Sequence, residues 1–178
     1  INQASNTFVN NASIIKKVDF PRNALVIANI LNDGLHFLLS IPVIILFFFI
    51  YDTPISISWL YGIPILLILQ AVFTYGLSLL IATINIFFRD MKRLVSILVR
   101  FLFFLTPIIY NYDIIPEKYR YLLVFNPLAP LMIGWRNLFL TGQLEGQTLL
   151  FTFVYATIAI FVGSIIYNRL VWKFSEVI

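Results

Sequence analysis

The run Leu35-His36-Phe37-Leu38-Leu39-Ser40-Ile41-Pro42-Val43-Ile44-Ile45-Leu46-Phe47-Phe48-Phe49-Ile50 decides what kind of fold this chain can adopt. It contains no Asp, Glu, Lys or Arg. A hydrocarbon layer of ~30 Å needs ~20 residues of helix at ~1.5 Å per residue. Counting back from Tyr51 places the inner boundary of such a helix near Leu31. The sequence therefore predicts a membrane-spanning helix over residues 24–50.

The composition of the whole chain gives the same indication. Of the 178 residues, 61% are hydrophobic, 11% are charged and 18 are Phe, whereas soluble domains average roughly 45–50% apolar and roughly 25% charged. This balance argues against disorder, a coiled coil and an ordinary cytosolic enzyme. The absence of Cys excludes disulfides and thiolate metal sites, and the one His leaves no histidine cluster. We expect an all-α, polytopic helical membrane protein.

Four long apolar stretches are predicted to span the membrane, at residues 24–50, 59–88, 94–110 and 148–171. Two shorter apolar segments lie between the last two stretches, at 119–125 and 128–140, and Asn126-Pro127 separates them. Because such segments are too short to span, they are predicted to be two short re-entrant helices. Region 111–147, which contains them, has no net positive charge and is predicted to be extracytoplasmic. Small residues spaced four apart predict faces for close helix packing, at Ser78 with Ala82 and at Ala159 with Gly163.

The charges set the expected orientation. Basic residues gather before the first stretch, between the second and third, and after the last, at Lys16, Lys17, Arg22, Arg89, Lys92, Arg93, Arg169 and Lys173. The other two connecting segments carry no net positive charge. Because cytoplasmic loops are enriched in Lys and Arg, the three basic segments are predicted to be cytoplasmic, the C-terminus included.

The sequence contains no familiar motif for catalysis or nucleotide binding. It has no G-x-x-x-x-G-K-[ST], H-E-x-x-H or G-x-S-x-G, and no stretch carries a row of carboxylates suited to relaying protons. These observations argue against a membrane enzyme, a proton-coupled carrier and a voltage-gated channel. We expect no catalytic residue, cofactor or metal in this chain, which leaves a pore or permease driven by a separate subunit.

The most specific segment is the basic, amphipathic run over residues 12–22, which ends in Phe20-Pro21-Arg22. From the residues alone, two interpretations stay open. The run is either a positively charged flank that meets lipid headgroups, or a segment that docks into a groove on a cytoplasmic partner. In the second case Ile14, Val18 and Phe20 would be the anchors, with Lys and Arg around them.

The run Ile14-Ile15-Lys16-Lys17-Val18-Asp19-Phe20-Pro21-Arg22 resembles the Leu-Ile-Lys-Lys-Val-x-Phe-Pro-Arg signature of a known family, the membrane subunits of ABC exporters for O-antigen and teichoic-acid polysaccharides. Three more stretches resemble that family in the same order: Asn85-Ile86-Phe87-Phe88-Arg89-Asp90, Thr106-Pro107-Ile108-Ile109-Tyr110 followed by Ile115-Pro116-Glu117, and Asn126-Pro127-Leu128 with Arg136. The family has six spans and commonly has Ser where Thr106 stands. The resemblance therefore implies one exporter membrane domain over 1–178, a fragment lacking the N-terminal spans.

The resemblance also implies what the chain does. It would form the path for a lipid-linked glycan across the bacterial inner membrane, while a separate ATP-binding subunit would carry ATP and Mg. The segment 12–22 and the second inner loop would contact that subunit through Ile14, Lys16, Lys17, Val18, Asp19, Phe20, Arg22, Arg89 and Asp90. The extracytoplasmic region would form an outer gate with Pro107, Tyr119, Asn126, Pro127 and Arg136. The bilayer is a further partner, and no nucleic acid is expected.

The third stretch supplies candidates for the substrate path: Arg100, Phe101, Phe104 and Tyr110. Arg100 either extends to the inner headgroups or faces the pore and pairs with a diphosphate. The aromatic side chains either pack against lipid or stack on sugar rings. Asp90 either contacts the partner or caps the third helix. Because one chain of four to six spans hardly encloses a pore for a sugar polymer, we expect a homodimer.

Two other functions stay open at this point. The same machinery would serve equally for a drug or a small lipid as cargo, since the spans carry no charge that separates these cargoes. A membrane glycosyltransferase would need outward-facing carboxylates or basic residues for sugar-phosphate chemistry. Only Asp113, Glu117 and Glu145 are candidates for that role, and they are sparse.

Overall fold

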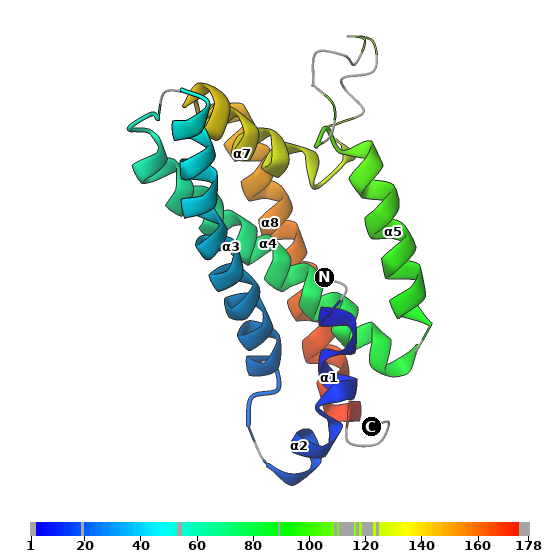
Figure 1. Cartoon of the computed structure of the whole chain (residues 1–178). Helices are drawn as coiled ribbons and strands as arrows, with labels where there is room; N and C mark the ends of the chain where they lie inside the picture. The colour runs from blue at the N-terminus through cyan, green and yellow to red at the C-terminus, as the bar shows by residue number, and fades with distance from the viewer. Residues whose placement is uncertain are drawn as a thin grey trace. The chain divides into compact units, whose positions relative to one another are not determined.

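The computed structural model describes residues 3–18, 20–52, 55–88, 90–108, 110, 116, 118, 123 and 125–174. Within these residues the regular elements are all helices, and no strand occurs among them (Figure 1). This confirms the prediction of an all-α chain. Asp19, Arg89 and Tyr119, three of the predicted site residues, lie outside the described part.

Three helices are long and apolar enough to cross a membrane: α3 (Ala24–Ile50), α4 (Trp59–Phe87), and α8 (Gly146–Leu170) together with the 3-10 turn η4 (Val171–Lys173). The bounds of α3 are those predicted, α4 ends one residue earlier, and α8 begins two residues earlier. Pro42 and Pro64 lie inside α3 and α4, and both helices continue through them. The lengths of the apolar runs therefore predicted these three helices closely.

The third apolar stretch forms a shorter helix, α5 (Met91–Leu105), of 15 residues. At ~1.5 Å per residue it extends ~22 Å, less than the ~30 Å of a hydrocarbon layer. It ends before Thr106-Pro107, as the sequence predicts, since a residue that precedes Pro is disfavoured in helical conformation. By length and composition α5 is not among the helices that qualify as membrane spans. The fourth span therefore stays a prediction.

Helix α7 (Ala129–Thr141) corresponds to the second of the two short helices predicted in the 111–147 region. The first, at 119–125, lies largely outside the described residues. Pro130 stands in the first turn of α7, where its missing N–H costs no helical hydrogen bond. At the other end, Gly142 adopts a φ of 68°, and its N–H donates to the carbonyls of Asn137 and Leu138. Glycine takes this left-handed conformation readily, so α7 ends there.

Short helical turns precede the first long helix. They are η1 (Ala4–Asn6), α1 (Thr7–Asn10) and α2 (Ala12–Lys17). Val18 has extended backbone and terminates α2, and its N–H donates to the Ile14 carbonyl. The asparagine-rich start of the chain is therefore helical, although its composition suggested only a polar segment.

The chain divides into two compact units, and the boundary between them passes through α3, α4, α5 and α8. The first unit comprises Ile1–Asn32, Ala71–Arg100 and Ala156–Ile178. Its core joins the N-terminal turns to α4 and to the end of α8, through Phe8, Ile15, Val26, Leu79, Ala82, Ile86 and Phe174. Figure 1 shows α1 beside the last turns of α8, where the Phe8 ring contacts those of Tyr167 and Phe174.

The second unit comprises Asp33–Gln70 and Phe101–Tyr155, and its core is rich in aromatic side chains. Trp59 and Trp135 lie at its centre, between α3, α4 and α7. The indole N–H of Trp59 donates to the Leu138 carbonyl at 2.9 Å, and that of Trp135 donates to Gln70 Oε1 at 2.8 Å. Both buried donors are thereby satisfied, as an apolar surrounding requires.

Helices α4 and α8 pass each other at very close range in the first unit. A Cβ added to Gly76 would overlap the backbone of Ala159 and Ile160, and one added to Gly163 would overlap the Gly76 carbonyl. The predicted small-residue face of α8 is thus used for packing inside this chain. The second predicted face, Ser78 with Ala82 on α4, is buried as well.

Candidate functional site

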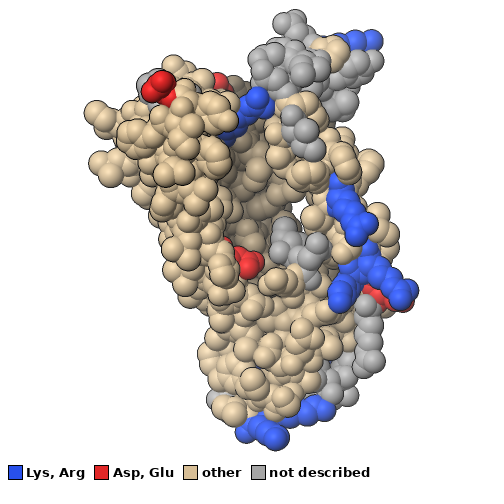
Figure 2. Space-filling view, in the orientation of Figure 1, with Lys and Arg blue, Asp and Glu red and all other residues tan. Residues whose placement is uncertain are grey.

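The basic segment 12–22 presents one face to the surface and the other to the core of the first unit. Ile15 is buried, whereas Lys16 and Lys17 are exposed. Ile14 and Val18 are exposed apolar side chains, 45% and 57% accessible. We call Ile14, Lys16, Lys17 and Val18 the exposed basic face. In Figure 2, blue side chains gather over α2, where this face lies.

The end of the same segment is anchored inward. Phe20, which the sequence predicts to be an anchor for a partner, is half-buried and packs against the core cluster of the first unit. The Arg22 guanidinium donates a hydrogen bond to the Val171 carbonyl and lies 5.7 Å above the Phe174 ring. Phe174 itself is fully buried. Because these contacts hold Arg22 against the end of α8, the side chain tethers the segment rather than facing outward.

These contacts place the exposed basic face on a rigid support. Ile15 belongs to the same core cluster as Leu79, Ala82 and Ile86 of α4. Phe8 and Phe174, from the two ends of the chain, belong to this cluster, and Phe20 packs against it. The residues behind α2 are therefore in one packed cluster with residues of α4 and Phe174.

The predicted contact in the second inner loop is only partly described. Arg89 lies outside the described residues, and Asp90 is exposed immediately before α5. The Asp90 carbonyl accepts hydrogen bonds from the N–H groups of Arg93 and Leu94, at 3.0 and 3.3 Å. Asp90 therefore lies at the N-cap position, directly before α5, where a carboxylate interacts favourably with the helix dipole. This position agrees with the cap interpretation and leaves the side chain accessible to a partner.

Three of the four predicted substrate-path residues, Arg100, Phe101 and Phe104, lie on an exposed side of α5. Arg100 is exposed, and among the described residues it makes no hydrogen bond or ion pair. Phe101 and Phe104 are also largely accessible. Blue side chains follow α5 in Figure 2, in agreement with the exposed Lys92, Arg93 and Arg100. The chain by itself thus leaves this mixed aromatic and basic surface uncovered.

Two polar contacts connect the end of α5 to α7. The Asn126 amide donates to the Thr106 hydroxyl at 2.9 Å, and the Arg136 guanidinium donates to the Tyr110 carbonyl at 2.9 Å. Thr106 and Pro107 are buried, and Pro127 is half-buried. Two of the predicted gate residues, Asn126 and Arg136, thus contact the segment that follows α5. Tyr110, which the sequence predicts for the substrate path, supplies the carbonyl that Arg136 contacts.

Several structurally important residues were not found by sequence reasoning. Phe8 was hidden in an asparagine-rich stretch, where one large apolar side chain was the available signal. Phe174 follows Lys173 in a predicted cytoplasmic tail, and nothing in the local pattern indicated its burial. Thr106 was noted only as a replacement for Ser, although its hydroxyl holds the Asn126 amide. Among the described residues, no group of acidic or histidine side chains is arranged to hold a metal ion.

Helical structure throughout the described residues, with three apolar helices of spanning length, defines the class: a multi-pass membrane protein. Residues 2–140 match the family described as ABC-2 type transporter. The match covers more than half of the chain, and the chain belongs to this family.

Three curated relatives are O-antigen export system permease proteins named RfbA. Two are from Klebsiella pneumoniae, 44% and 42% identical to this chain over 172 residues, which is 97% of the chain. One is from Myxococcus xanthus, 26% identical over 168 residues, or 92% of the chain. The chain spans about two thirds of the length of these relatives, 66% of the Klebsiella proteins and 64% of the Myxococcus protein.

Proposed function

We propose that this chain is the transmembrane subunit of an ATP-driven exporter that moves a lipid-linked polysaccharide across the bacterial inner membrane. The observation that carries the proposal is 44% identity, over 97% of the chain, to an O-antigen export system permease. An O-antigen or a teichoic-acid type of glycan is the proposed cargo. The chain is not an enzyme in this proposal, since a separate subunit would hold ATP and Mg and hydrolyse the nucleotide.

The exposed basic face of α2 is the proposed contact with the ATP-binding subunit. Ile14 and Val18 are apolar and exposed, and Lys16 and Lys17 flank them, a combination suited to docking in a groove with acidic rims. Asp19, Arg89 and Asp90 are proposed to lie at the same contact. ATP binding would act by favouring one of two arrangements of the spans, through contacts that differ between them.

The proposed topology keeps α5 as the fourth span. A helix of 15 residues is short for this role, so the span must be completed by the segment that includes Thr106 and Pro107. Non-helical backbone is tolerated at membrane depth where protein covers it. The burial of Thr106 and Pro107 and the hydrogen bond from Asn126 support that arrangement. Region 111–147 would then be extracytoplasmic and re-entrant, and the C-terminus cytoplasmic.

The exposed side of α5 is the proposed lining of the path. Arg100, Phe101 and Phe104 are accessible in the single chain, and Arg100 is suited to pairing with a diphosphate. A second copy of the chain would face this surface and close the conduit. The cluster of Pro107, Tyr110, Asn126, Pro127 and Arg136, with Tyr119, is the proposed outer gate. Because its polar contacts join α5 to α7, movement of α5 would change the gate.

The experiment that tests the function uses the full-length permease with its ATP-binding subunit. Lys16→Glu combined with Lys17→Glu should abolish glycan export and uncouple the ATPase activity, because like charges would then face an acidic groove. Export is measured as surface polysaccharide, and ATP hydrolysis is measured in proteoliposomes. Arg169→Glu reverses an exposed charge outside the proposed contact and serves as the control. Normal export with normal coupling in the double variant would refute the proposed contact. A wild-type complex that exported small amphiphiles but no glycan would refute the cargo.

A further inference from the structure

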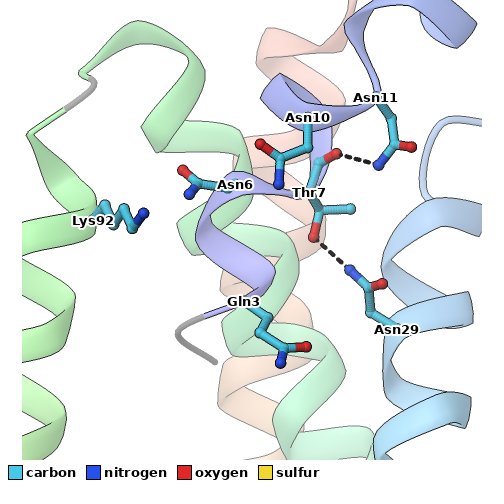
Figure 3. A pocket seen from close by; sticks show the side chains of 7 residues that line it. All are labelled: Gln3, Asn6, Thr7, Asn10, Asn11, Asn29 and Lys92. Carbon is cyan, nitrogen blue, oxygen red and sulfur yellow. Dashed lines mark hydrogen bonds between the residues drawn. The ribbon is translucent and has the colours of Figure 1, made fainter.

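The first unit contains a pocket of about 420 Å³ that the proposed function does not use (Figure 3). Its lining comes from the N-terminal turns, from Asn29 on α3 and from Lys92 on α5. Every lining residue is polar, in a chain that is 61% hydrophobic. A polar pocket of this size, within the ~300–1,000 Å³ typical of small-molecule sites, needs an explanation.

The wall of the pocket is held in place by its own hydrogen bonds. The Asn11 amide donates to the Thr7 carbonyl at 2.8 Å, and the Asn29 amide donates to Thr7 Oγ1 at 2.7 Å, as Figure 3 shows. Asn6 Oδ1 accepts a hydrogen bond from the buried Asn85 amide at 3.3 Å. These bonds leave the side-chain oxygens of Asn11 and Asn29 as acceptors, and the NH2 group of Asn6 as a donor. The wall is thus oriented before any ligand binds.

Three further groups at the pocket have their hydrogen-bonding capacity available. Among the described residues, the side chains of Gln3, Asn10 and Lys92 make no hydrogen bond or ion pair. In Figure 3, Lys92 extends from α5 towards Asn6 and Asn10. Each amide offers two donors and one acceptor, and Lys92 offers a positive charge. The pocket therefore combines one cation with several neutral groups that both donate and accept.

This combination matches one kind of ligand, a phosphate that carries hydroxyl groups. The ammonium of Lys92 suits one phosphate oxygen, and the amides of Gln3 and Asn10 suit neighbouring hydroxyls. The lining has no aromatic ring on which a nucleobase would stack, and a single cation is too little for a polyanion.

We propose that this pocket binds the phosphate-linked sugar head of the lipid-linked glycan before transport. The inference rests on the proposed function for the identity of the cargo. Its location agrees, because the N-terminal segment, the start of α3 and the start of α5 are all on the predicted cytoplasmic side. The bilayer also contains headgroups of the same chemistry, such as phosphatidylglycerol, so the test compares both sources.

The test measures binding rather than transport. Full-length permease, in complex with its ATP-binding subunit in detergent, is titrated with farnesyl diphosphate carrying one N-acetylglucosamine, and bound probe is counted by native mass spectrometry. The second titration uses dioleoyl phosphatidylglycerol. Lys92→Gln removes the cation, and Asn10→Asp places a negative charge in the pocket. Both side chains are exposed, so the variants should fold. Arg93→Gln removes a neighbouring exposed charge that does not line the pocket, and is the matched control.

We expect about tenfold weaker probe binding in Lys92→Gln and in Asn10→Asp, the size expected for one charge-assisted hydrogen bond, and no change in Arg93→Gln. Equal binding in all four proteins would overturn the pocket assignment, even if the wild-type complex exported glycan normally. The same variant pattern with phosphatidylglycerol alone would overturn the cargo and identify a bilayer lipid as the ligand. Failure of glycan export by the wild-type complex would count against the proposed function, whereas binding at the pocket is measured independently of export.

Discussion

Single polar side chains hold together the described residues between α5 and α7. The Thr106 hydroxyl donates to the Leu102 carbonyl at 2.6 Å and accepts from the Asn126 amide at 2.9 Å. Asn126 Oδ1 in turn accepts from the N–H of Leu128 at 3.0 Å. Thr106 and Asn126 are both buried, so each group lacks the alternative of bonding to water. These two residues therefore fix where the chain turns between α5 and α7.

Replacing Thr106 tests this residue contact. Thr106→Val keeps the shape but removes the hydroxyl, which leaves the buried Asn126 amide without its partner and should cost about 1–3 kcal/mol. Thr106→Ser keeps the hydroxyl and should have little effect. The midpoint temperature of unfolding of the purified full-length permease measures both. Equal midpoints for the Val and Ser variants would contradict the role assigned to the hydroxyl.

Arg22 and Phe174 illustrate a second kind of residue contact, between segments far apart in the sequence. The guanidinium donates to the Val171 carbonyl and lies over the Phe174 ring. Phe174 also lies 5.1 Å from the Phe8 ring. The basic residues of the segment 12–22 thus differ in their surroundings. Lys16 and Lys17 are exposed, whereas Arg22 contacts Val171 and Phe174 within the first unit.

At the scale of elements, the packing of α4 on α8 depends on residues without large side chains. Gly76 and Gly163 allow the two backbones to meet, and Ala159 completes the contact. In a membrane, helices gain little from exchanging lipid for protein, so close van der Waals contact matters more than apolar area. The small-residue face of α8 is consequently occupied within the chain, so the proposed homodimer would use other surfaces.

Gly76→Ala should destabilise the protein, because the added methyl group would overlap the Ala159 backbone, which has no rotamer with which to move aside. A cost of about 1–3 kcal/mol is typical of such overpacking. Gly34→Ala in α3 is the matched control, since a Cβ there meets nothing within 4 Å. It should be neutral or stabilising, because Ala is favoured over Gly in helices by about 1 kcal/mol. Thermal unfolding of both variants decides the comparison. A Gly76 variant as stable as the Gly34 variant would show that the crossing is looser than described.

At the scale of the whole molecule, the open question of topology is whether α5 spans the bilayer. The three helices that qualify by length leave the number of crossings between α4 and α8 to be determined. Loop charge predicts one crossing by α5, because Lys92 and Arg93 precede it whereas the region after it is neutral overall. Asp90 and Gln143 then lie on opposite sides of the membrane.

Single cysteines test this prediction, since the 178 residues contain no Cys. In a cysteine-free full-length permease, Gln143→Cys should react with a membrane-impermeant maleimide added to intact spheroplasts, because Gln143 is exposed and belongs to the region predicted to be extracytoplasmic. Asp90→Cys and Ser13→Cys should react only after the membrane is opened. Labelling of Asp90→Cys and Gln143→Cys from the same side would contradict the crossing by α5. A single symmetric peak in gel filtration of each purified variant confirms that it has folded.

The helical class, the positions of α3, α4 and α8, and the resemblance to exporter membrane subunits could all be predicted from the sequence. These predictions were possible because the length of an apolar run indicates whether a helix lies in a bilayer, which requires about 20 such residues. The proposed coupling residues were also visible as a pattern. The pattern could not separate Lys16 and Lys17, which are exposed, from Phe20 and Arg22, which turn inward.

The neighbours that each side chain contacts became known from the three-dimensional structure. It buried Phe8 and Phe174, joined Thr106 to Asn126, and gathered Lys92 with amides from the N-terminal turns and from α3 around one pocket. In a chain this apolar, a Phe or Leu facing lipid and one facing protein give the same hydropathy. The choice between them depends on shape and on hydrogen bonds between residues distant in the sequence, and neither is encoded in the local pattern.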